Sequence, residues 1–205
     1  ELQVAGATGV AATASAAALN ITAVGSNPGW VIAFPCGTSP SSPLASTVNV
    51  WPGHAIANMT FAAIGASGKV CFQSMTDVEL VVDLQGWFPS GASYHAFSPV
   101  RALDTRETGP AVSPGTIREV PVAGKFGVPT GATTVSVNVT AVNATGPAWV
   151  KVFPCGTAVP ETSNNNTSPD RIVATQALVT VGANGSICLA ANLTTDLVVD
   201  LQGYL

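Results

Sequence analysis

Two pairs of carboxylates are the first groups in this sequence whose spacing is compatible with catalysis. Glu79 and Asp83 lie four residues apart in an apolar stretch, and Asp196 and Asp200 repeat the arrangement. Residues i and i+4 of a strand point to the same face, so each pair would present two acids together, as a glycosidase does. Because the pair recurs in a hydrophobic strand, we interpret these acids as structural, bonded to arginine or to backbone.

Other catalytic signatures are sparse. His54 and His95 have no nucleophile motif beside them, and no G-x-S-x-G, P-loop or H-E-x-x-H pattern occurs. The acids around Asp77 and Asp104 do not resemble a dedicated calcium loop. We therefore expect no enzymatic activity, no cofactor and no metal.

The densest charge cluster is PVRALDTR, which contains Arg101, Asp104 and Arg106. A buried arginine needs a partner, and bidentate contacts with carboxylates are the strong kind. We expect Arg101 or Arg106 to bond an acid of a D-L-Q-G strand, either Asp83 or Asp200. Bonding to Asp83 would make the segment complete the first half of the chain or join the two halves, whereas bonding to Asp200 would make it open the second half.

Aromatic side chains suggest a different chemistry. Trp51 lies in a V-W-P-G-H turn, where an exposed indole would stack on a sugar ring. Together with His54, Trp87 and Tyr94 it would form a glycan-binding platform. The alternative is that Trp51 is a hydrophobe that anchors its loop.

An internal repeat determines which elements position these groups. Five segments recur in the same order, 117 to 119 residues apart, and they are 4–10 and 122–128, 19–24 and 137–142, 30–38 and 149–157, 65–72 and 182–189, and 81–88 and 198–205. The stretch 94–120 has no counterpart before Glu1, so a full first copy would need roughly 27 more residues upstream or a segment supplied from elsewhere. We place the modules at 1–93 and 94–205.

Each copy is expected to form β-strands. In 134–142 and 78–87 apolar residues alternate with polar ones, the period of a half-buried strand. The alanine-rich 11–18 aligns with a predicted strand of the second copy. Turn signals recur every 8–12 residues or so. The sequence therefore predicts an all-β protein of two tandem antiparallel β-sandwich modules.

The four cysteines fall at matched places in the two copies. Four cysteines allow three pairings, and only Cys36–Cys71 with Cys155–Cys188 gives both copies the same internal bond. A metal site is the alternative, but no C-x-x-C pair occurs and neither histidine recurs. We expect disulfides, and with them an oxidising, extracytoplasmic location.

Composition excludes two classes of partner. Of the 205 residues, 47% are hydrophobic and 9% charged, with seven Lys and Arg and a net charge of −4. This leaves no basic surface for nucleic acid and no polybasic patch for a membrane. No apolar run is long enough to span a bilayer.

Four motifs follow one another along the chain, and they are R-x-L-D-T-R at 101–106, V-A-G-x-x-G-V-P at 122–129, V-N-V-T-A at 137–141 and V-V-D-L-Q-G-Y at 198–204. With these motifs in this order, the chain resembles a repeat module of large secreted proteins in actinobacteria and their relatives. It implies export, a place on or outside the cell wall and a non-catalytic role. The chain departs from that pattern in its first copy, which lacks the opening motif, and in its F-P-C-G strands, whose extra disulfide suggests a harsh or mechanically loaded exterior.

Together these features favour a non-catalytic structural or adhesive module of a secreted or cell-surface assembly. Its partners would be copies of itself, neighbouring repeats, or cell-wall or environmental polysaccharide. Carbohydrate binding through exposed aromatics is the main alternative, and a hydrolase or its accessory domain ranks last. If the opening strand of one module completes a neighbour, chains would link by strand addition.

Overall fold

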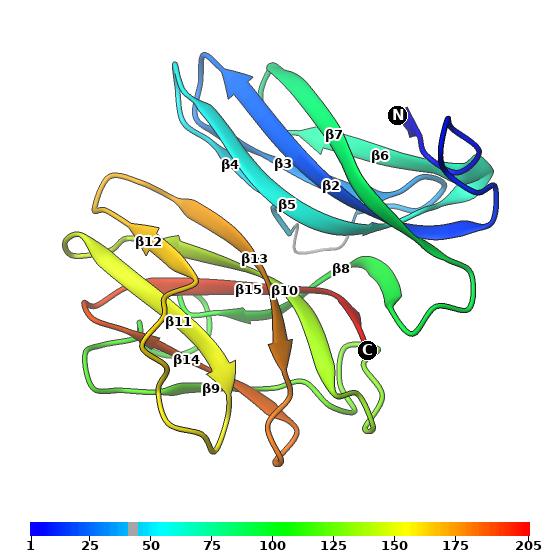
Figure 1. Ribbon diagram of the computed structural model, residues 1–205. Helices are drawn as coiled ribbons and strands as arrows, with labels where there is room; N and C mark the ends of the chain where they lie inside the picture. The colour runs from blue at the N-terminus through cyan, green and yellow to red at the C-terminus, as the bar shows by residue number, and fades with distance from the viewer. Residues whose placement is uncertain (41–44) are drawn as a thin grey trace. The chain divides into compact units, whose positions relative to one another are not determined.

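The computed structural model describes residues 1–40 and 45–205, and they form two compact all-β units (Figure 1). Unit 1 is Glu1–Val100 and unit 2 is Arg101–Leu205. The boundary falls inside strand β8 (His95–Asp104), a few residues beyond the expected start of the second module at 94. Within the described ranges, the one helical element is the short 3-10 turn η1 (Ala66–Gly68).

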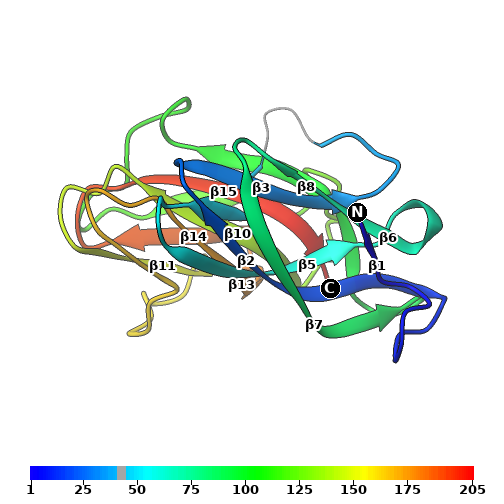
Figure 2. The same cartoon turned by 90° about the horizontal axis from the view of Figure 1, so that it is seen from above.

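Unit 1 consists of a four-stranded and a three-stranded antiparallel sheet, with strand orders β1-β6-β3-β4 and β5-β2-β7 (Figures 1 and 2). The strands are β1 (Leu2–Gln3), β2 (Ala14–Gly25), β3 (Gly29–Pro35), β4 (Val48–Val50), β5 (Ala55–Ala63), β6 (Lys69–Ser74) and β7 (Val78–Pro89). The alanine-rich start of β2 is a strand, as predicted, and places small side chains at the core.

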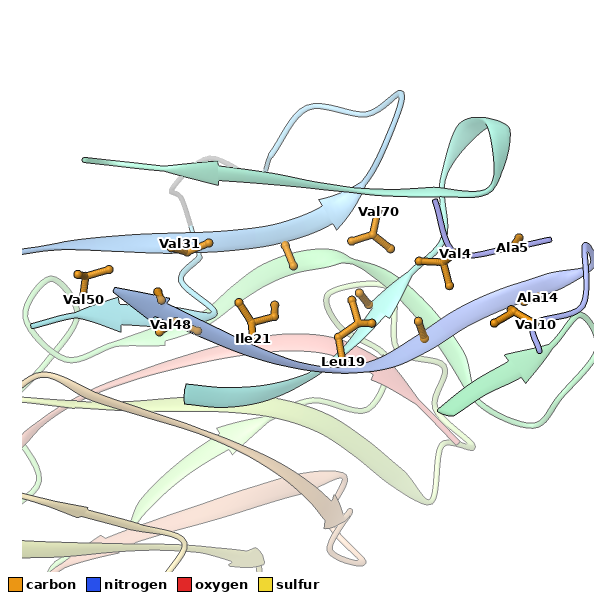
Figure 3. Packing of buried hydrophobic residues seen from close by; sticks show 14 residues of the cluster. Val4, Ala5, Val10, Ala14, Leu19, Ile21, Val31, Val48, Val50 and Val70 are labelled. Atoms are coloured by element: carbon orange, nitrogen blue, oxygen red, sulfur yellow. The ribbon is translucent and has the colours of Figure 1, made fainter. Parts of the chain in front are cut away.

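The core of unit 1 lies between these two sheets (Figure 3). Leu19 and Ile21 of β2 point toward Val31 of β3 and Val70 of β6, and all four are fully buried. Facing side chains of two stacked sheets form the core of a β-sandwich, about 10 Å thick. Unit 1 is therefore a sandwich of small and branched apolar residues.

Unit 2 contains two four-stranded sheets, with orders β13-β10-β15-β8 and β12-β11-β14-β9. Its remaining strands are β9 (Arg118–Pro121), β10 (Thr134–Val142), β11 (Ala148–Pro154), β12 (Asn165–Thr167), β13 (Val173–Thr180), β14 (Ser186–Ala191) and β15 (Asp196–Tyr204). By the sequence repeat, β7 of unit 1 corresponds to β15. In unit 2, β8 follows β15 in the sheet, whereas in unit 1 the sheet ends at β7.

Both predicted disulfides are confirmed. Cys36 bonds Cys71, and Cys155 bonds Cys188. Each bond connects adjacent antiparallel strands. The first cysteine directly follows one strand, and the second lies in the neighbouring strand, opposite the residue two positions before the first; in unit 1, Phe34 pairs with Cys71. The repeat therefore determines both the sheet pairing and the position of the disulfide that connects it.

The prediction of a half-buried strand over 134–142 is wrong for its polar face. Ser136, Asn138 and Thr140 are as buried as the valines that alternate with them. β10 lies in the interior of its sheet, between β13 and β15. The Ser136 hydroxyl accepts a hydrogen bond from the Gln176 amide at 2.6 Å, whereas the buried Thr140 hydroxyl has no hydrogen-bond partner among the described residues.

Candidate functional site

The charged segment Arg101–Arg106 lies against β15. The Arg101 guanidinium donates from Nε and Nη2 to the Asp200 carboxylate, and from Nη1 to Asp104 at 3.0 Å. The Asp200 side chain is fully buried and that of Arg101 is 12% exposed. Of the two acids considered for this arginine, the structure uses Asp200, so the segment belongs to unit 2. Replacing Arg101 would leave the buried Asp200 carboxylate without this ion pair.

Asp104 is the centre of this cluster. Its carboxylate accepts from Arg106 at three positions, the backbone N–H at 3.1 Å, Nε at 2.8 Å and Nη2 at 2.5 Å. The hydrogen bonds from the Arg106 side chain, together with the charges of Arg106 and Arg101, outweigh burial and lower the pKa of Asp104 below its ordinary value. Asp104 is thus held as a carboxylate that fixes two arginines.

Thr105 fixes the register between the charged segment and β15, a contact that the sequence analysis did not predict. Its N–H donates to the Leu197 carbonyl at 3.0 Å, and its hydroxyl oxygen accepts from the Leu197 N–H at 2.9 Å. The same hydroxyl donates to Asp196 at 2.9 Å. Because Thr105 meets Leu197 whereas Arg101 meets Asp200, the segment runs antiparallel to β15. The threonine inside L-D-T-R was the available signal.

The paired acids of β15 are therefore engaged in structural contacts. Asp200 binds Arg101, and Asp196 accepts from Thr105 and from the Asn143 amide at 3.0 Å. These contacts use the acids to hold one strand against another. They correspond to the structural interpretation of the pairs rather than to a general acid and a nucleophile on either side of a sugar.

The equivalent acids of unit 1 have a different environment. Asp83 pairs with Asn20 in the register of β7 and β2, as Asp200 pairs with Asn138. Yet Asp83 is exposed, and so is Glu79, the counterpart of Asp196. Over the described residues, no hydrogen bond or ion pair reaches the Asp83 carboxylate. The same motif therefore builds a closed site on β15 and an open one on β7.

The structure does not bring the four aromatic and histidine candidates together. The Trp51 turn lies at one end of β2, because the Gly53 N–H donates to the Gly25 carbonyl at 3.1 Å. Trp87 pairs with Ala17 near the opposite end of that strand. Eight residues of strand separate these positions along β2, roughly 26 Å. His54 accompanies Trp51, exposed, with Nδ1 3.0 Å from the Pro52 carbonyl oxygen.

Trp87 and Tyr94 have structural contacts of their own. The Trp87 indole donates to the Gly9 carbonyl at 3.2 Å. Tyr94 is buried, with its ring centroid 5.6 Å from that of Phe61 and 4.7 Å from that of Phe88. Its contacts resemble those of a core aromatic, which anchors the chain where it leaves β7.

One cluster has metal-ligand composition among the described residues. Glu1, Cys36 and Cys71 offer donor atoms within 4.8 Å of one another. However, Cys36 and Cys71 are bonded to each other, and zinc is bound by free thiolates. The arrangement is a disulfide beside an exposed acid.

Comparison with known proteins gives no relatives, since no family model, no curated protein and no solved structure matches the chain. No helix in the ranges that the structure describes is long and apolar enough to cross a membrane. The two disulfides are typical of an oxidising, extracytoplasmic environment.

Proposed function

We propose that this protein is a non-catalytic structural repeat of a secreted or cell-surface assembly, like the actinobacterial repeat modules that its motifs resemble. The proposal rests on one observation, which is that the clustered charged side chains bond one another and hold a strand in place. In a chain with few charges, Arg101, Asp104, Arg106 and Asp200 are used to fasten one strand to a sandwich. Such a module would display its surface and transmit load.

The disulfides support the same role. Each unit has one covalent link between adjacent strands, at equivalent positions. A link of this kind restricts the unfolded chain and keeps a module intact where no chaperone or reductant is at hand. Its repetition in both copies suits a protein that is exposed to an oxidising exterior.

The location is tested on intact cells that make the protein. Antibody labelling and brief protease treatment should reach it before lysis, with a cytoplasmic protein as the control. Detection only after lysis would contradict the proposal. The catalytic alternative predicts that the purified chain hydrolyses wall polysaccharide, and that replacing Asp200 abolishes this while the fold survives.

Carbohydrate binding is the competing function, and the Trp51 turn is the part of the expected platform that would serve it. Trp51 is half-buried and the neighbouring His54 is exposed, whereas Tyr94 lies in the core. A glycan array and a pull-down with insoluble wall polysaccharide decide between the two. The structural role predicts no saturable glycan binding. Binding that Trp51→Ala removes and Trp87→Ala leaves unchanged would establish the lectin-like function instead.

A further inference from the structure

We propose that the outer edge of β7 is a docking site for an extended polypeptide segment of the R-x-L-D-T-R type, added antiparallel as a fourth strand of that sheet. The proposal rests on the structural role above and names the partner that such an assembly would use. In it, an arginine of the incoming strand bonds Asp83 as Arg101 bonds Asp200. A threonine four residues later takes the place beside Leu80 that Thr105 takes beside Leu197.

Unit 2 already contains the completed arrangement. β15 and β7 share the sequence V-V-D-L-Q-G, and each pairs on one side with the equivalent strand, β10 or β2. On the other side β15 is next to β8, whereas β7 ends its sheet. An edge strand presents unpaired N–H and C=O groups to any chain that can extend the sheet.

The strand β7 also exposes apolar surface that its counterpart β15 buries. Leu84 pairs with the fully buried Leu19, so both side chains point to the core face of the sheet, yet Leu84 is 42% exposed. Its counterpart in β15, Leu201, is fully buried. Val81 on the opposite face of β7 is 57% exposed. An added strand would cover the core-facing leucine, in addition to the main-chain hydrogen bonds by which a peptide extends a sheet.

The edge of β7 is also acidic, because Asp83 and Glu79 lie on it and both are exposed. A strand bearing arginine at the position of Arg101 supplies the matching charge, and guanidinium–carboxylate bonds are both strong and directional. The acid therefore selects which segment docks, as well as its register.

The occupant is not the β8 strand of a second copy. Residues 1–205 contain two D-L-Q-G strands but one R-x-L-D-T-R segment. A copy that donated its β8 to a neighbour's β7 would uncover its own β15, so the number of open edges would not fall. The docking partner is thus a further segment with the same sequence pattern.

The test uses the 205-residue chain and a fluorescent synthetic peptide of residues 94–108, YHAFSPVRALDTRET. Fluorescence anisotropy should show saturable binding, and hydrogen exchange should show new protection in β7. Asp83→Asn in the chain, or Arg101→Ala in the peptide, should weaken binding about tenfold or more, the value of a charged hydrogen bond. Asp77→Asn, which removes the same charge from the exposed turn before β7, should leave binding unchanged.

Three results would overturn the proposal. These are no binding at millimolar peptide, binding that Asp83→Asn does not weaken, and protection that appears elsewhere than in β7. The last includes exchange of the peptide for β8 on β15. Each of these results leaves the surface location untouched, because that is measured on cells, so the two proposals fail separately.

Discussion

The guanidinium of Arg101 donates to the buried carboxylate of Asp200, and this bond joins residues that are 99 positions apart in the chain. It fastens β8 to β15 and so turns the sheet of unit 2 from three strands into four. The corresponding acid of unit 1, Asp83, lies in the same sequence motif but at an open edge.

Arg101→Ala should destabilise unit 2 strongly. The substitution leaves Asp200 buried without its ion-pair partner, which costs about 3 kcal/mol or more and should lower the melting temperature by about 10 °C or more for a domain of this size. Thermal denaturation followed by circular dichroism measures the change. Lys125→Ala removes an exposed charge and serves as the control. Equal melting of the two variants would show that the bond contributes nothing.

Stability should fall in acid partly through Asp104. The pKa of Asp104 is lowered in the folded protein, chiefly by its hydrogen bonds with Arg106. Its stabilising effect is therefore complete above the ordinary aspartate pKa of about 4 and is lost as the pH falls through the lower, folded-state pKa. Melting temperatures between pH 6 and pH 2.5 should fall less steeply for Asp104→Asn, which is already weaker at pH 6. Parallel curves for the two proteins would contradict this.

Removing either disulfide should cost a similar amount of stability. The bonds close loops of 35 and 33 residues, and the chain-entropy estimate gives about 4 kcal/mol for each. The double variants Cys36→Ala/Cys71→Ala and Cys155→Ala/Cys188→Ala test this by guanidinium unfolding. A large loss in one unit with none in the other would show that loop entropy is not the main contribution.

Gly65→Ala should disrupt the turn beside the first disulfide. A Cβ at this position would lie 2.1 Å from the Cys36 carbonyl oxygen and 2.3 Å from its nitrogen, which are backbone atoms that cannot rotate away. We expect a loss of about 2 kcal/mol or more, as for other overpacked sites. Gly182→Ala should behave alike in unit 2, where Cys155 is the obstacle. Gly131→Ala is the control, because its Cβ would meet nothing within 4 Å. Unchanged unfolding of Gly65→Ala would refute the steric argument.

The sequence was sufficient to predict the features that recur in both copies of the repeat. Strand type follows from alternation, and the disulfide pairing follows because one pattern must satisfy both copies, as Cys36–Cys71 and Cys155–Cys188 do. It could not choose between Asp83 and Asp200, since local sequence around the two acids is the same. Only the long-range placement of β8 distinguishes them.

The aromatic candidates show the same limit. The exposure of a side chain depends on which distant residues cover it. Tyr94 is buried by Phe61 and Phe88, and the indole of Trp87 is held by the Gly9 carbonyl. Neither contact is encoded near the residue itself, so a platform assembled from residue types alone has no geometric support.

The positions of the disulfides also determine how far the chain can be drawn out. When a chain is pulled from its ends, the residues enclosed by a closed loop cannot extend. The loops here enclose 35 and 33 residue steps, and each withholds roughly 120 Å of contour length at full extension. Reduction would release that hidden length in two separate increments. Under tension, the oxidised protein would therefore act as a short tether with a fixed limit of extension.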